Sequence, residues 1–212
     1  MHKILHIITT INRGGAENHL CELIEGLCQR GVTVGVAYLK GDGYWRDRLL
    51  ACGATVYPLQ LNYYGQISPL LKLRNVIKEF TPTIVHAHLP PAELYCRLAL
   101  LSLFSSVPLV ISKHNDEPFY KIASSDWLDR LIANRARFMI GISQAVSNYF
   151  QKKNIFPENK IKTIHYGIPF PSQAPTHEEI SALRQQWLGD ANGLLIMTVA
   201  RLAPQKALHI LI

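Results

Sequence analysis

Residues 83–115 read TIVHAHLPPAELYCRLALLSLFSSVPLVISKHN and contain the pattern from which the fold follows. Two short apolar runs, Thr83–Ala87 and Leu109–Ser112, have the length of buried strands, and the longer apolar segment Ala92–Phe104 between them has the length of a helix. A strand followed by a helix and a second strand joins two parallel strands through a crossover connection. This stretch therefore predicts one βαβ unit.

The same alternation of short and long apolar segments continues on both sides. Strands are predicted at Lys3–Thr9, Thr33–Leu39, Ala54–Leu59, Phe138–Ile142 and Ile161–His165. Helices are predicted at Ala16–Cys28, Trp45–Ala51, Ser125–Arg137 and Gln144–Lys152, and one more begins at Ser68 as N-cap with Pro69 in its first turn. Because the strands are almost wholly apolar, we expect helices on both faces of the sheet. The predicted fold class is α/β, a doubly wound, Rossmann-like parallel sheet.

The sequence predicts a change of organisation near residue 168. Residues 1–168 supply the strands and helices of the Rossmann-like domain, and residues 169–190 form a proline-containing linker and a helix that begins with the capping box of Thr176 and Glu179. Residues 191–212 supply one apolar strand, Gly193–Val199, and the beginning of one helix. One strand and part of a helix cannot bury their own apolar faces. We therefore expect 191–212 to be the start of a second, incompletely represented Rossmann-like domain.

Composition narrows the classes of protein. The chain has 212 residues, of which 48% are hydrophobic and 17% charged, and this excludes a disordered chain. The four cysteines form no C-x-x-C pair, so we expect neither a zinc ribbon nor a disulfide framework, and a reducing compartment fits. The apolar stretch 94–111 is interrupted by Arg97 and Pro108, which argues against a membrane span.

The net charge indicates an anionic partner. Lys and Arg number 22 and Asp and Glu number 15, which gives +7. Phosphate groups, nucleic acid and an acidic membrane surface would all suit this charge. No basic stripe interleaved with aromatic residues is present, so we do not expect nucleic-acid binding.

A glycine pair follows the first predicted strand. Gly14 and Gly15 stand at a strand-to-helix turn, where backbone amides at the helix N-terminus can face a phosphate group. The alternative is a tight turn that binds nothing. The G-x-G-x-x-G pattern is absent, which argues against a nicotinamide or flavin enzyme.

Histidines follow two further strands. His86 and His88 are two apart on one strand and share a face, so they could bind a metal or a sugar, or could be hydrogen-bonded packing residues. For a metal, His114 and Asp116 are the only further candidates that this pattern identifies, and we expect no metal site. His114 lies in a polar run after its strand, where it could donate a hydrogen bond or transfer a proton, or belong to a solvated loop.

Polar groups also follow the later strands. Ser143 could be part of the site or cap the helix that begins at Gln144. Arg201 and Lys206 together suit a diphosphate, because an Arg fork and a Lys point charge complement its oxygens. The alternative is two surface charges at a helix start.

The order of these motifs resembles that of the retaining glycosyltransferases of family 4. The matching pieces run through the whole chain: GGAE at 14–17, IVHAH at 84–88, LVISKHN at 109–115, IGISQAV at 140–146, IHYGI at 164–168 and VARLAPQKA at 199–207. The last piece is the most specific, since it is similar to the family motif G-R-L-x-x-x-K-G. The resemblance implies the GT-B fold, in which two Rossmann-like domains face each other across a cleft.

The resemblance also implies a nucleotide-sugar donor, with a UDP-sugar as the expectation. Gly14 and Gly15 would lie beside its diphosphate, and Arg201 and Lys206 would neutralise that diphosphate as it departs. Ala200 and Ala207 stand where the family usually has glycine, and Ala207 would narrow the approach to phosphate. The E-x7-E carboxylates of the family have no counterpart in this chain, so we expect the 212 residues alone to be nearly inactive.

On the acceptor side, the resemblance implies that His114 lies near the transferred sugar as the catalytic histidine. His88, Asn115 and Asp116 are the candidates for the acceptor pocket. The acceptor would be a glycan or a lipid-linked glycan, and no cofactor or metal is implied.

Three functions remain open from the sequence. The first is a retaining, metal-independent glycosyltransferase of polysaccharide or glycolipid biosynthesis, cytoplasmic and peripheral at the inner face of the membrane. The second is a non-catalytic module that binds a glycan or a partner. The third is a metal-dependent hydrolase that uses His86 and His88.

Overall fold

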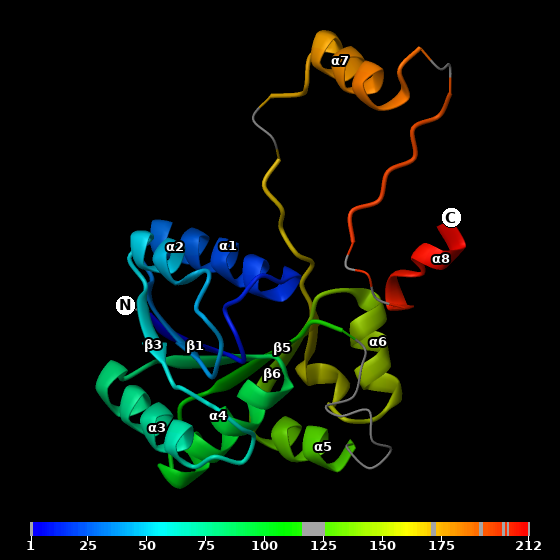
Figure 1. Cartoon of the computed structure of the whole chain (residues 1–212). Helices are drawn as coiled ribbons and strands as arrows, with labels where there is room; N and C mark the ends of the chain where they lie inside the picture. The colour runs from blue at the N-terminus through cyan, green and yellow to red at the C-terminus, as the bar shows by residue number, and fades with distance from the viewer. Residues whose placement is uncertain are drawn as a thin grey trace. The chain divides into compact units, whose positions relative to one another are not determined.

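The computed structural model describes residues 2–115, 126–170, 173–190, 193–200, 202 and 204–211. Its contacts divide the chain into two compact units, Met1–Ile168 and Pro169–Ile212. Figure 1 shows the first unit as a sheet between helices, and the second as a helix, α7, with extended chain on either side of it.

Seven parallel strands form one sheet in the first unit, in the order β3-β2-β1-β4-β5-β6-β7. The strands are β1 Lys3–Ile8, β2 Thr33–Tyr38, β3 Thr55–Pro58, β4 Ile84–His88, β5 Leu109–Lys113, β6 Ala136–Gly141 and β7 Ile161–Thr163. The chain builds outward from β1 to β3 in one direction, then returns to β4 and builds outward in the other. The predicted doubly wound sheet is confirmed, and β7 ends two residues earlier than expected.

Helices cover both faces of this sheet (Figure 1). They are α1 Gly15–Gln29, α2 Arg46–Ala51, α3 Ser68–Phe80, α4 Pro90–Ser102, α5 Asp126–Arg135, α6 Gln144–Lys152 and the short η1 Glu158–Lys160. Leu5 and Ile7 of β1 are buried in the cluster that includes residues of α3 and α4, whereas Ile8 is buried in the cluster with α1 and α2. Because side chains alternate along a strand, His6 faces the same side as Ile8, toward α1.

Local capping explains several helix boundaries. Ser143 caps α6, since its Oγ accepts a hydrogen bond from the Val146 amide at 3.3 Å. The prediction that Ser68 caps α3 is wrong: Ile67 is the N-cap, and Ser68 is the first helical residue. Pro69 has no N–H, so the first turn of α3 has one donor fewer to satisfy.

The second unit contains three described helices and no described strand. They are α7 His177–Leu188, η2 Pro204–Lys206 and α8 Leu208–Leu211. Thr176 and Glu179 form the predicted capping box of α7. The predicted strand at 193–199 is wrong, because residues 193–200 have no regular secondary structure and no described strand of this unit offers them a partner. The predicted helix over 203–212 is interrupted at Ala207, whose φ of 50° is left-handed.

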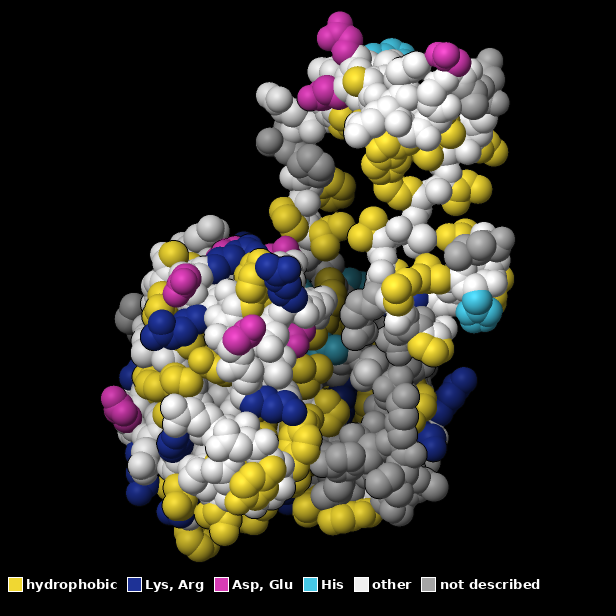
Figure 2. Space-filling view, in the orientation of Figure 1, with side chains coloured by type: hydrophobic (Ala, Val, Ile, Leu, Met, Phe, Trp, Pro, Cys, Tyr) yellow, Lys and Arg dark blue, Asp and Glu magenta, His cyan; other side chains and the backbone are white. Residues whose placement is uncertain are grey.

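Two surface properties bear on partners. Figure 2 shows Lys and Arg side chains spread over the visible face of the first unit among acidic ones, so the positive charge does not form one stripe on this face. Within the described residues, every helix is too short or too polar to cross a membrane.

Candidate functional site

The candidate site lies where the sheet changes its direction of winding. The connections after β1 and β4 leave these neighbouring strands toward opposite faces of the sheet, since α1 and α4 pack in different clusters. In doubly wound sheets, ligands bind in the crevice that such a divergence opens at the carboxyl ends of the strands. The glycine pair at the start of α1 and the histidines of β4 both stand at this point.

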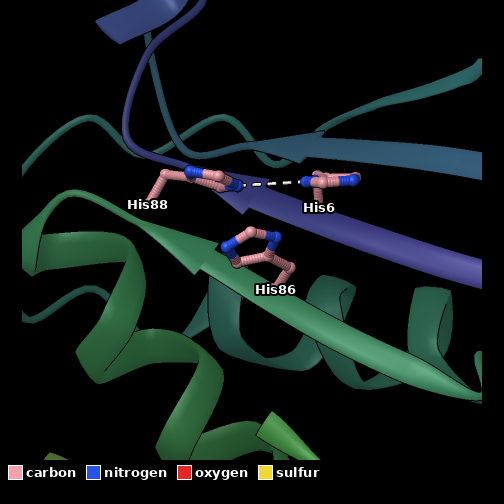
Figure 3. A group of neighbouring side chains, drawn as sticks. All are labelled: His6, His86 and His88. Atoms are coloured by element: carbon pink, nitrogen blue, oxygen red, sulfur yellow. Dashed lines mark hydrogen bonds between the residues drawn. The ribbon is translucent and has the colours of Figure 1, made fainter. Parts of the chain in front are cut away.

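Three histidines are gathered on the α1 side of the two central strands. His6 of β1 pairs in register with His86 of β4, and His88 follows two residues later on the same face. Nδ1 of His6 lies 3.0 Å from Nε2 of His88, and the rings of His86 and His88 lie 4.1 Å apart, centroid to centroid. Figure 3 shows the three rings turned toward one another. All three side chains are buried.

Hydrogen bonds extend this group toward the sheet edge. Nδ1 of His88 lies 3.3 Å from Nε2 of His114, and Nδ1 of His114 is hydrogen-bonded to the Tyr166 hydroxyl. The Tyr166 ring stacks on His19 of α1 at 3.6 Å between centroids. The network therefore joins β1, β4, the residue after β5, the segment after β7 and α1.

Burial keeps the imidazoles of this network neutral. It lowers the pKa of His6 to about 3 and that of His114 to about 4. The pKa of His88 is also well below its ordinary value, through burial and then through repulsion by His86 and His6. Burial, and then the negative charge of Glu17, raise the pKa of Tyr166 to about 12. Each imidazole can thus donate one hydrogen bond and accept one, and the phenol stays protonated at neutral pH.

The glycine turn presents the N-terminus of α1 at this edge. Gly14 is the N-cap of α1, and both Gly14 and Gly15 are exposed. The Glu17 carboxylate folds back over this end of the helix, where Oε1 accepts a hydrogen bond from Thr10 Oγ1 at 2.7 Å. The free amides of a helix N-terminus attract anions. In this structure the anion at that position is the carboxylate of Glu17.

A buried ion cluster lies beside His114. Nζ of Lys113 is 2.6 Å from Oε2 of Glu93 on α4 and 2.9 Å from Oδ1 of Asp129 on α5. Burial opposes the charge on Lys113, but the two carboxylates outweigh it and raise the pKa of Lys113. The cluster ties both helices to the end of β5 and holds the backbone from which His114 projects.

The structure brings most of the expected site residues to one edge. Gly14 and Gly15 begin the helix that carries His19, and His19 connects through Tyr166 to His114 and so to His88. Asn115 is exposed directly after His114. The expected partners Asp116 and Arg201 lie outside the described residues. Lys206 belongs to the second unit, in the short helix η2.

Sequence reasoning missed three members of the network: His6, His19 and Tyr166. Within the described residues, the third imidazole beside His86 and His88 is His6 and not the expected His114. His6 could have been found once β1 and β4 were assumed to be neighbours. Side chains alternate between the two faces of a strand, and His6 lies on the same face as His86, its partner in the ladder. Tyr166 stands inside the IHYGI piece, and nothing local distinguishes His19.

These features define the first unit as a Rossmann-like domain with a candidate ligand site at the switch point of its sheet. The family model described as Glycosyltransferase Family 4 matches residues 13–170. The chain belongs to this family.

Individual relatives agree with the family. The "GalNAc-alpha-(1->4)-GalNAc-alpha-(1->3)-diNAcBac-PP-undecaprenol alpha-1,4-N-acetyl-D-galactosaminyltransferase" of Campylobacter jejuni is 27% identical over 126 residues, which are 57% of this chain and 34% of the relative. The crystal structure of Anabaena Alr3699/HepE with UDP and glucose is 25% identical, with a TM-score of 0.80, over 100% of this chain and 56% of that one. A glycosyltransferase of Rickettsia africae, 17% identical with a TM-score of 0.68 over 90% of this chain and 50% of its own, shares the fold. The chain thus spans about half the length of the structures it matches, and about a third of the curated relative.

Proposed function

We propose that this chain is the acceptor-side domain of an enzyme that transfers a sugar from a nucleotide-sugar donor, a UDP-sugar, to a glycan or lipid-linked acceptor with retention at the anomeric carbon. The observation that carries the proposal is the connection of His114 through Tyr166 and His19 to the helix that begins at Gly15. It brings a proton-exchanging group and an anion-attracting helix end to one sheet edge. The UDP complexes of Anabaena HepE support the choice of donor.

The leaving diphosphate would be stabilised by fixed groups of the chain. Negative charge develops on the diphosphate as the sugar departs, and preorganised donors and cations lower the barrier most where they face that charge. The amides at the start of α1, beside Gly14 and Gly15, supply donors, and Arg201 and Lys206 supply the cations. With these groups the transfer requires no divalent ion at the diphosphate.

The histidines would serve the acceptor and the transferred sugar. His114 would form a hydrogen bond with the reacting groups through Nδ1, in place of the Tyr166 hydroxyl, while His88 holds its Nε2 at 3.3 Å. Asn115 and Asp116, directly after His114, would contact the acceptor. The low pKa of His114 keeps its imidazole neutral at physiological pH, so it would act on the acceptor hydroxyl by hydrogen bonding rather than by holding its proton.

The name of the Campylobacter relative indicates an acceptor linked through pyrophosphate to undecaprenol. We extend this to a role in polysaccharide or glycolipid synthesis at the inner face of a membrane. The net charge of +7 would favour an anionic lipid surface.

Calorimetric titration tests the donor assignment directly. A panel of UDP-, GDP-, CDP- and dTDP-sugars would be added to the chain and to the variants Arg201→Ala, Lys206→Ala and His114→Gln. We expect a UDP-sugar to bind best, each cation variant to weaken its binding about tenfold, and His114→Gln to leave it nearly unchanged. Equal affinity in wild type and both cation variants would refute the role of these cations. Binding with no transfer, even by the longest natural form of the protein, would favour the non-catalytic module.

A further inference from the structure

The structure contains a cluster of three imidazoles. The proposed transfer gives a role to one of them, His88, and none to His6 and His86. His6, His86 and His88 each offer a ring nitrogen, and these nitrogens lie within 4.8 Å of one another. The rings are buried and turned toward a common space (Figure 3). We propose that His6, His86 and His88 form a binding site for a divalent transition metal of the zinc class. This inference goes beyond the proposed function, because the site lies behind His114 rather than at the diphosphate.

Rigid neighbouring strands hold the three residues. His6 and His86 are partners in the parallel ladder between β1 and β4, the two central strands at the switch point. His88 shares their face from two residues further along β4. Sites built on strands keep their geometry better than sites on loops. The two strands therefore hold the three rings close together before any metal arrives, and small ring movements would complete the site.

The donor set selects the kind of metal. Three imidazole nitrogens suit zinc, copper, nickel and ferrous iron, whereas calcium and magnesium prefer oxygen ligands. No carboxylate or thiolate of the described residues joins the three nitrogens.

The spacing of the first two nitrogens is close to what zinc needs. Zinc binds imidazole nitrogen at about 2.0–2.1 Å in tetrahedral geometry, which sets two ligand nitrogens about 3.3 Å apart. Nδ1 of His6 and Nε2 of His88 are 3.0 Å apart and now share one proton. Opening this pair by a few tenths of an ångström would admit the ion. The shared proton would move to the other nitrogen of its own ring, so no proton has to leave the protein.

The outer nitrogens of two rings already have partners of the kind that metal-bound histidines use. A ligating histidine commonly donates its second N–H to a neighbouring group, and this fixes the ring. Nε2 of His86 lies 2.8 Å from Ser112 Oγ, which leaves its Nδ1 available as the ligand. Nδ1 of His88 lies 3.3 Å from Nε2 of His114. Nε2 of His6 is buried without a described partner, and this limits the expected affinity.

An occupied site would act on the candidate catalytic histidine. With Nε2 of His88 on the metal, its Nδ1 must carry the proton and donate it to Nε2 of His114. His114 then carries its own proton on Nδ1, toward Tyr166. The metal would thus select one tautomer of His114 without touching any substrate.

The test titrates metal into the chelator-treated, full chain and uses no nucleotide sugar, so its outcome is independent of the donor assignment. We expect one equivalent of Zn²⁺ to bind with micromolar affinity or better in calorimetry, and Co²⁺ to give the visible absorption of a four-coordinate site. Mg²⁺ and Ca²⁺ should not bind. His86→Gln, whose amide can keep the bond to Ser112, and His6→Gln should each weaken Zn²⁺ binding at least tenfold. His177→Ala, an exposed histidine of the second unit, should leave binding unchanged.

Folding is checked by thermal unfolding of each variant without metal. Imidazole ¹H–¹⁵N NMR of the wild type provides a reading that needs no variant, since Zn²⁺ should shift the rings of His6, His86 and His88 and not that of His177. Absence of Zn²⁺ binding by the wild type, undiminished binding by the folded variants, or shifts confined to exposed histidines would each overturn the proposal.

Discussion

The carboxylate of Glu17 lies so close over Gly14 that a Cβ atom at residue 14 would overlap Oε2 of Glu17. Gly14 has an extended backbone, with φ of −173° and ψ of 160°, which any residue can adopt. The backbone conformation therefore does not require glycine, but a side chain at residue 14 would displace the flexible Glu17 carboxylate. Thr10 holds the Glu17 carboxylate there, and a diphosphate bound at this helix end, as proposed above, would have to displace it.

Neutralising Glu17 should strengthen donor binding. Glu17→Gln keeps a hydrogen-bond acceptor for Thr10 but removes the negative charge from the helix end where the diphosphate is proposed to bind. We expect a several-fold lower Kd for the UDP-sugar at low salt, with a smaller gain at high salt, measured by calorimetry. The matched control is Glu22→Gln, further along the same helix, which should change the Kd little. A weaker donor complex in Glu17→Gln would mean that Glu17 itself contacts the donor.

Removing the Tyr166 hydroxyl should uncouple His114 from α1. Tyr166→Phe retains a ring to stack on His19 but leaves Nδ1 of His114 without its partner. An unsatisfied buried polar atom costs about 1–3 kcal/mol of unfolding free energy, which urea denaturation would measure. Tyr149→Phe on α6 is the control and should change stability by less than about 0.5 kcal/mol. An equally small effect of Tyr166→Phe would show that water replaces the hydroxyl at no cost.

The sequence predicted the parts of the fold that depend on local pattern. The apolar runs located all seven strands of the sheet to within two residues at either end, because buried parallel strands need continuous apolar character. The run at 193–199 has the same character and forms no strand, since a strand exists only through hydrogen bonds to a neighbour. An apolar run thus indicates that a segment can form a strand. Whether it does so depends on a neighbouring strand with which it can form hydrogen bonds.

Members of the histidine network were predicted only where a motif marked them. His88 and His114 stood at strand ends, where ligands bind, and both belong to the observed network. His6 stood in the middle of a strand, and its place beside His86 depends on the adjacency of β1 and β4, which no local pattern reveals. Lys113 directly follows the predicted strand Leu109–Ser112, and nothing local indicates that it is buried between Glu93 and Asp129 on two separate helices. The periodicity of a sequence does not show which distant segments come into contact, and these residues depend on such contacts.

Replacing Lys113 should destabilise the first unit strongly. Lys113→Met leaves Glu93 and Asp129 buried as neighbouring like charges without their cation. Breaking a buried ion pair by removing one partner costs about 3–5 kcal/mol, which chemical denaturation would measure. Lys152→Met, at an exposed position of α6, should cost less than about 0.5 kcal/mol. Adding Glu93→Gln to Lys113→Met should recover part of the loss, and a loss below about 1 kcal/mol in the single variant would contradict the proposed importance of the cluster.

Acid should unfold the protein through its buried histidines. The pKa is about 3 for His6 and about 4 for His114 in the folded chain, both below the value of about 6.5 expected in the unfolded chain. Between about pH 6.5 and 4 the unfolded state therefore binds more protons than the native state, so stability is present above this window and is lost as pH falls through it. Each such histidine contributes a slope of about 1.4 kcal/mol per pH unit. Urea denaturation at pH 7, 6 and 5 should show a steep decline in unfolding free energy. His6→Gln should reduce the slope of this decline by the contribution of one histidine, about 1.4 kcal/mol per pH unit. Equal stability at pH 7 and pH 5 would mean that the folded state binds these protons as readily as the unfolded state does.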